Sequence, residues 1–192
     1  MQNIPFKIDF SRLSVYLCGP IDNAEDGDGG KGWREKIVPK LLSLGFKQEN
    51  IFNPCDKPIN SKGLDNEGEF GVCEKFRLNK DWEGLISYTK NFMSYDLRLV
   101  DKADIIIAKI NTGERTTGSI QEIVVARNAH KPVYLIDKYS PNGTSSWLMA
   151  LIGTIDRIFK NDDDLIYELN IFKNTGISKP KDLKDYLILY DN

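Results

Sequence analysis

Hydrophobic positions along the chain fall into short apolar runs separated by longer segments with helical periodicity. The apolar runs predict five strands, at residues 13–18, 51–54, 104–108, 132–136 and 156–159. The third run is a nearly unbroken stretch of isoleucine. Such a continuous β-branched run is typical of a central parallel strand that is covered on both faces.

The segments between these runs predict the helices. Apolar residues recur at helical spacing at 33–44, 82–100, 120–129, 145–151, 162–170 and 179–190. Residues 56–80 are polar and show no clean period, so this segment is predicted to be an inserted loop. Strands that alternate with helices form right-handed βαβ units. The pattern therefore predicts an α/β protein with a doubly wound, flavodoxin- or Rossmann-like parallel sheet of about five strands and helices on both faces.

Composition narrows the class of protein. The chain has 192 residues, 41% of them hydrophobic, which indicates a single globular domain over residues 1–192. Basic and acidic residues number 26 and 28, for a net charge of −2, and this balance disfavours a nucleic-acid polymer as partner. Three cysteines and one histidine disfavour a structural zinc site. No apolar run reaches the ~18 residues of a membrane span, so a cytoplasmic protein with no membrane partner is expected.

Glu122 is the first candidate for chemistry. It lies in residues 116–126, a segment rich in glycine and hydroxyl groups that reads as a loop entering a helix. A carboxylate in the first turn of such a helix lies beside a backbone anion site and could attack a sugar carbon as a nucleophile. The pair Ser119 and Glu122 also has the spacing of a capping box. This segment alone favours the capping interpretation, because capping is the commoner use of that spacing.

Three pieces of sequence together point to a family. They are residues 15–21, which end in Gly19-Pro20-Ile21, residues 95–106, which begin Tyr95-Asp96-Leu97, and the Glu122 segment with the following residues 130–133. In this order and spacing the chain resembles the nucleoside 2-deoxyribosyltransferase family, which includes related nucleotide N-glycosidases. The likeness extends from about residue 13 to residue 136.

The resemblance implies a reaction and a set of site residues. Glu122 would attack C1′ of a 2′-deoxyribonucleoside, hold the sugar as a covalent ester and pass it to another nucleobase. Tyr16 would orient and activate Glu122, and Asp96 would help to protonate the leaving base. Neither a metal nor another cofactor is needed for this chemistry. The implied substrate contacts are Gly19, Pro20, Thr116, Thr117, Gly118, Ser119 and Met149.

The chain also departs from the family pattern. Thr116 stands where many members carry an aspartate next to the base, and the stretch 147–149 lacks an asparagine that several members use. Without the resemblance, Tyr16 favours a core position, and Arg34 favours a solvated or salt-bridging position over a phosphate-binding one. The leading prediction is thus a deoxyribosyltransferase. The alternatives are a hydrolase of 2′-deoxynucleoside 5′-monophosphates and a non-catalytic nucleotide-binding module.

The expected partners are small molecules and further copies of the chain. The small molecules are deoxynucleosides or deoxynucleotides and free nucleobases. A homo-oligomer, at least a dimer, follows from the resemblance and from the apolar segments 147–152 and 186–190. The alternative is that both segments fold back onto their own domain.

Overall fold

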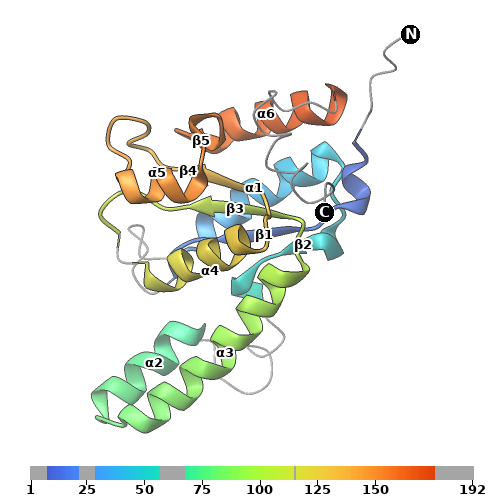
Figure 1. Ribbon diagram of the computed structural model, residues 1–192. Coiled ribbons are helices and arrows are strands. Elements are labelled where there is room, and N and C mark those ends of the chain that lie inside the picture. The colour runs from blue at the N-terminus through green and yellow to red at the C-terminus, as the bar shows by residue number, and fades with distance from the viewer. Residues whose placement is uncertain (1–7, 22–28, 57–67, 115, 176–192) are drawn as a thin grey trace, which may run out of the picture.

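The computed structural model describes residues 8–21, 29–56, 68–114 and 116–175 (Figure 1). Its centre is a five-stranded, all-parallel sheet in the order β2-β1-β3-β4-β5. The strands are β1 (Val15–Cys18), β2 (Ile51–Phe52), β3 (Ile105–Lys109), β4 (Val133–Ile136) and β5 (Ile158–Phe159). The predicted doubly wound α/β fold is confirmed, and all five strands lie within the predicted runs or extend them by one residue.

Six α-helices accompany the sheet in the described chain. They are α1 (Lys31–Leu44), α2 (Gly68–Leu78), α3 (Trp82–Lys102), α4 (Thr117–Asn128), α5 (Ser146–Ile152) and α6 (Asp162–Thr175). Short 3-10 turns are η1 (Phe10–Arg12), η2 (Gln48–Asn50), η3 (Pro54–Asp56) and η5 (Ile155–Arg157). Local signals fix several ends. Gly45, for example, ends α1 at a φ of 106°, which glycine adopts without strain.

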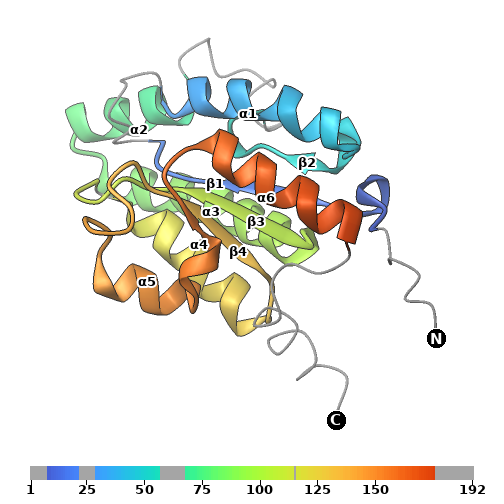
Figure 2. The ribbon, with the colours of Figure 1, turned by 90° about the horizontal axis from the view of Figure 1, so that it is seen from above.

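The helices cover the two faces of the sheet in separate layers. One core contains Val15, Leu17 and Ile107 of the sheet and packs against α1 and α6, which lie side by side (Figure 2). The other core contains Tyr16 and Ile106 and packs against α3, α4 and α5. Because successive strand residues point to opposite faces, β1 and β3 supply both cores.

The segment predicted as a loop at 56–80 is partly helical, and the prediction is wrong there. Its described part forms α2, which pairs with the beginning of α3, and this helical hairpin extends away from the sheet (Figure 1). Val72 and Cys73 are buried, and the Phe76 and Tyr88 rings lie 5.9 Å apart between the two helices. Because α2 packs against a single helix, its apolar stripe is narrow, and this explains why residues 56–80 show no clean helical period.

Of the two segments expected at an oligomer interface, one lies in the described part of the chain. Residues 147–152 lie in α5, which buries Leu148 and Ile152 in the core and leaves Trp147 82% exposed. The predicted helix at 179–190 lies outside the described residues.

Candidate active site

Tyr16 and Glu122 lie in direct contact although 106 positions separate them in the chain. Tyr16 stands inside β1 and is completely buried on the face covered by α3 and α4. Its hydroxyl donates a hydrogen bond of 2.9 Å to Oε1 of Glu122 on α4. The Glu122 side chain is partly exposed. A buried donor therefore fixes the carboxylate of a partly exposed residue.

The surroundings of Tyr16 keep its hydroxyl protonated. Burial raises the pKa of Tyr16 well above its ordinary value, and the negative charges of Glu122 and Asp96 raise it further. Tyr16 therefore stays a hydrogen-bond donor to Glu122 at neutral pH. Asp96 comes from α3 and is 7% exposed. The three residues predicted as catalytic thus come from β1, α3 and α4 to one face of the sheet.

Cys18 lies beside this group as a neutral thiol. Its Sγ donates a hydrogen bond of 3.5 Å to the backbone carbonyl of Ser119 on α4. Burial raises the pKa of the Cys18 thiol well above its ordinary value, and the charge of Glu122 acts in the same direction. Cys18 therefore packs β1 against α4 and lacks the thiolate character of a nucleophile.

The capping-box interpretation of Ser119 and Glu122 is wrong. Helix α4 begins at Thr117 with Thr116 as its N-cap, and no side chain caps this end. Ser119 is therefore the third residue of the helix and Glu122 the sixth, so Glu122 lies in the second turn and not in the first. The field of the helix end falls off within the first turn. The contact that positions Glu122 is the hydrogen bond from Tyr16.

Thr116 and Thr117 line a cavity of about 470 Å³ between the loop after β3, the beginning of α4 and α5. We call it the α5 cavity; its walls also include Ile120, Ser145 and Leu148. Within the described chain, the Thr116 hydroxyl oxygen is buried without a hydrogen-bond partner. Gly118 is exposed, Ser119 is buried and Met149 is half-buried, and none of the three lines this cavity.

Gly19 and Pro20 follow β1 and lie on the other side of the sheet edge. A Cβ at Gly19 would meet the Lys109 carbonyl oxygen at 2.8 Å and the Trp33 ring at 3.1 Å, so only glycine fits there. Protein therefore fills the space on the side of Gly19 where a side chain would lie. Pro20 lines a separate cavity on the side of α1 and α6.

Arg34 is a buried residue whose role the sequence analysis missed. It is fully buried in α1 and donates hydrogen bonds to the carbonyl oxygens of Leu17, Gly30 and Gly19 at 3.2, 2.6 and 2.9 Å. The guanidinium therefore fixes the exit from β1 to the beginning of α1. A solvated or salt-bridging position is the expectation from sequence, because arginine is rarely fully buried and the carbonyl acceptors leave no side-chain pattern in the sequence.

Two further features concern ions and membranes. Over the described ranges, no group of three or more histidine, cysteine, aspartate or glutamate side chains is placed to hold a metal ion. In the same part of the chain, no helix combines the length and apolar character that a membrane crossing needs.

Comparison with known proteins gives one named relative. The chain is 26% identical over 167 residues to the DNA primase small subunit PriS of Methanocaldococcus jannaschii. The matched region covers 86% of this chain but 39% of the relative, so the chain spans about two-fifths of that protein. No protein-family model matches the chain.

The comparison corrects the family and the partners expected from the sequence. The relative is named for DNA primase and not for deoxyribosyl transfer, so the assignment to the nucleoside 2-deoxyribosyltransferase family is contradicted, together with that activity. Neither the N-glycosidase nor the non-catalytic alternative gains support. The expectation of no nucleic-acid polymer as partner is contradicted as well. The expectation of an enzyme is supported, although of another kind, since the relative is named as a subunit of one.

Proposed function

We propose that the chain is an enzyme that acts on nucleotides or nucleic acid, with Tyr16 and Glu122 as its catalytic centre. The observation that carries the proposal is the 2.9 Å hydrogen bond from the buried Tyr16 hydroxyl to the partly exposed Glu122 carboxylate. A carboxylate that a buried donor holds in place, on a residue that is itself partly exposed, is suited to proton transfer. The named relative supports nucleotides or nucleic acid as the substrate class.

Glu122 acts as a general base in this proposal. Its carboxylate takes the proton of a hydroxyl group or a water molecule, and the oxygen so released forms a bond to the phosphorus of a nucleotide phosphate. The bond from that phosphorus to the leaving oxygen breaks, and the leaving group departs with the electron pair. Tyr16 keeps its own proton, because burial raises its pKa, and holds Glu122 in one orientation. Asp96 adds a second carboxylate near the same hydroxyl.

Polymerases commonly use a pair of metal ions for this class of reaction. The described residues do not fit such a pair, since they contain no group of three metal-binding side chains. The step above therefore uses only Tyr16 and Glu122.

The α5 cavity is the proposed place for the substrate phosphate. Thr116 and Thr117 line it at the beginning of α4, where backbone N–H groups favour an anion. The buried Thr116 hydroxyl, which lacks a partner within the described chain, offers one further donor. Thr116 and Glu122 are six positions apart, which corresponds to about 9 Å along the axis of α4. This spacing suits a nucleoside triphosphate whose terminal phosphates lie in the cavity and whose first phosphate, the reacting one, extends toward Glu122.

The test is a turnover assay with the purified full chain. Nucleoside triphosphates are supplied with and without single-stranded DNA and Mg²⁺, and released phosphate, released pyrophosphate and label joined to an oligonucleotide are measured. We expect turnover by the wild type and a loss of about a hundredfold or more in Glu122→Gln. Glu83→Gln is the matched control, because Glu83 is exposed in the first turn of α3.

Two results contradict the proposal. One is a wild-type chain that turns over no nucleotide with or without DNA. The other is a Glu122→Gln variant that is as active as the Glu83→Gln control.

A further inference from the structure

A second cavity lies on the opposite side of the sheet from Tyr16 and Glu122. Its volume is about 360 Å³, and it is formed by α1, the loops after β1, β3 and β4, and the beginning of α6. Neither Tyr16 nor Glu122 lines it. It lies at the carboxyl ends of β1, β3 and β4, the edge at which doubly wound sheets bind their ligands.

Four lysines from four segments line this cavity, which we call the lysine cavity. Lys36 comes from α1, Lys109 from the end of β3, Lys138 from the loop after β4 and Lys160 from the residues before α6. Lys36, Lys109 and Lys160 form no ion pair with any other described residue. The Lys109 ammonium lies 5.9 Å from the centre of the Trp33 ring, which forms part of the wall.

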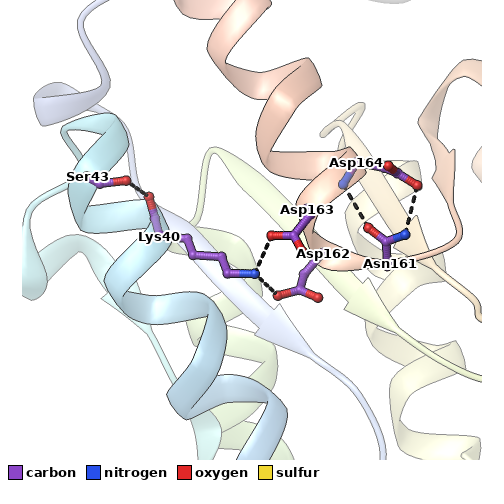
Figure 3. A network of polar contacts seen from close by, with 6 residues as sticks. All are labelled: Lys40, Ser43, Asn161, Asp162, Asp163 and Asp164. Atoms are coloured by element: carbon purple, nitrogen blue, oxygen red, sulfur yellow. Dashed lines mark hydrogen bonds and ion pairs between the residues drawn. The ribbon is translucent and has the colours of Figure 1, made fainter.

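The two carboxylates of the lining are bound by other groups. The Asp162 carboxylate forms an ion pair with the Lys40 ammonium at 2.5 Å, and Lys40 also pairs with Asp163 at 2.6 Å (Figure 3). Lys40 belongs to α1 and does not line the cavity. Glu114 accepts a hydrogen bond of 2.7 Å from the backbone N–H of Asn111. The four lysines and two carboxylates of the lining together have a formal charge of +2. Lys40, which lies outside the lining, offsets the negative charge of Asp162.

Two neutral polar side chains, Trp33 and Asn161, also belong to the wall. The Trp33 side chain is more than nine-tenths buried, and its ring N–H has no acceptor within the described chain. Asn161, which also lines the cavity, is turned toward α6, where its side chain bonds the N–H and the carboxylate of Asp164 (Figure 3). The acidic beginning of α6 is thus engaged by Lys40 and Asn161, and Lys36, Lys109 and Lys160 remain available to a ligand.

We propose that the lysine cavity binds the di- or triphosphate group of a small molecule such as a nucleotide. Several ammonium groups around one volume match a chain of phosphates, whose charge is spread over successive oxygen atoms. The volume falls within the range of about 300 to 1,000 Å³ typical of small-molecule sites. The site is separate from the proposed catalytic centre, so it stands whether or not Glu122 acts as a base.

Isothermal titration of the full chain tests the proposal with inorganic triphosphate, ATP, AMP and adenosine. We expect triphosphate and ATP to bind, AMP to bind more weakly and adenosine not to bind. Affinity should fall as salt rises, because the contacts are between charges. If ATP binds more tightly than inorganic triphosphate, the natural ligand is a nucleotide; equal affinities indicate the phosphate chain alone. Both results support the site.

The double variant Lys36→Gln/Lys160→Gln should weaken triphosphate binding at least tenfold. Both side chains are exposed, so the folded core is kept, and thermal unfolding checks this. Lys90→Gln/Lys102→Gln is the matched control, with the same change of net charge at exposed positions of α3. The proposal is overturned if triphosphate does not bind, if ATP binds while triphosphate does not, or if both double variants lose the same affinity.

Discussion

Two fully buried polar side chains, Tyr16 and Arg34, connect β1 to the helices on its two faces. Tyr16 points to the face of α3 and α4, where its hydroxyl donates to Glu122. Arg34 approaches β1 from α1 and donates to the carbonyl oxygens of Leu17 and Gly19. Each side chain is expensive to bury alone and is stabilised by its acceptors. Their removal is therefore expected to have different consequences, for turnover in one case and for folding in the other.

Tyr16→Phe should slow turnover without loss of the fold. The ring still fills its place in the core, and only the donor to Glu122 is removed. A hydrogen bond to a charged group contributes about 1.5 to 3 kcal/mol, so kcat should fall about ten- to a hundredfold while KM changes little. Steady-state kinetics with the nucleotide assay measures this. Tyr167→Phe on α6, where the side chain is 69% exposed, is the control, and equal rates in the two variants would remove Tyr16 from the mechanism.

Arg34→Met should destabilise the chain strongly. The substitution keeps much of the side-chain volume but leaves the carbonyl oxygens of Leu17, Gly19 and Gly30 without this donor. A buried polar group left unpaired costs about 1 to 3 kcal/mol, so the free energy of unfolding should fall by about 3 kcal/mol or more. Denaturant unfolding measures the change, with Arg98→Met at an exposed position of α3 as the control. Matching midpoints would contradict a structural role for Arg34.

At this scale the sequence could identify part of the site. Tyr16 and Glu122 were predicted together, and the structure brings them into contact. Arg34 could not be predicted, because its partners are backbone carbonyls whose positions depend on the folded loop. The Glu122 segment was assigned to the first turn of a helix, since a sequence shows hydroxyl residues but not which of them begins α4.

Among the elements, α1 and α6 are joined on one face of the sheet by an ion pair between residues far apart in the sequence. Both helices pack on the same core, and Lys40 joins α1 to Asp162 and Asp163 at the beginning of α6 (Figure 3). Hydrogen bonds to the two aspartates raise the pKa of Lys40 above its ordinary value. Burial alone would raise the pKa of Asp162, but the hydrogen bond and charge of Lys40 outweigh it and lower that pKa.

Lys40→Met should remove a small, pH-dependent part of the stability. A partly exposed pair of this kind contributes less than about 1 kcal/mol. The Asp162 pKa is lowered in the folded state, so its share is present above the unfolded pKa of about 4 and lost as pH falls below it. The Lys40 pKa is raised, so its share is present below about 10.4 and lost as pH rises through the folded value.

Unfolding of the wild type and of Lys40→Met is therefore compared from acid to alkaline pH. The difference in free energy should be constant between about pH 5 and 9 and should shrink at both extremes. Lys47→Met, at an exposed position after α1, is the control. A difference that is the same at every pH would contradict the ion pair as its source.

For the elements, prediction succeeds where an element contacts the sheet. The five strands are predicted from short apolar runs, because strands covered on both faces are apolar throughout. Helix α2 was missed, because it packs on α3 and not on the sheet, and so carries only a narrow apolar stripe in a polar, glycine-containing segment.

On the scale of the whole molecule, the distribution of charge matters more than its sum. A net charge of −2 disfavoured a nucleic-acid partner, yet four lysines gather at one edge of the sheet. Net charge averages over the surface, whereas a phosphate responds to charges within about 10 Å. The family was misassigned for a related reason. A strand that ends in a glycine turn and a carboxylate that follows another strand are features of the doubly wound fold, which hosts many activities.

The hairpin of α2 and α3 is expected to unfold locally at a lower free energy than the sheet. It extends away from the sheet (Figure 1), and the contacts of α2 are made chiefly with α3. In native-state hydrogen exchange, the α2 amides should open locally at a free energy well below that of global unfolding, while the β1 and β3 amides exchange only when the whole chain unfolds.

Exchange measured in increasing denaturant tests this, and one opening free energy for α2 and β3 would contradict it. Gly84→Ala sharpens the test, because a Cβ there would lie 2.5 Å from the Phe76 ring. That substitution should speed exchange in α2 and leave the β3 amides unchanged. The consequence is that α2 can be opened, cleaved or redesigned as a unit while the sheet that holds Tyr16 and Glu122 stays folded.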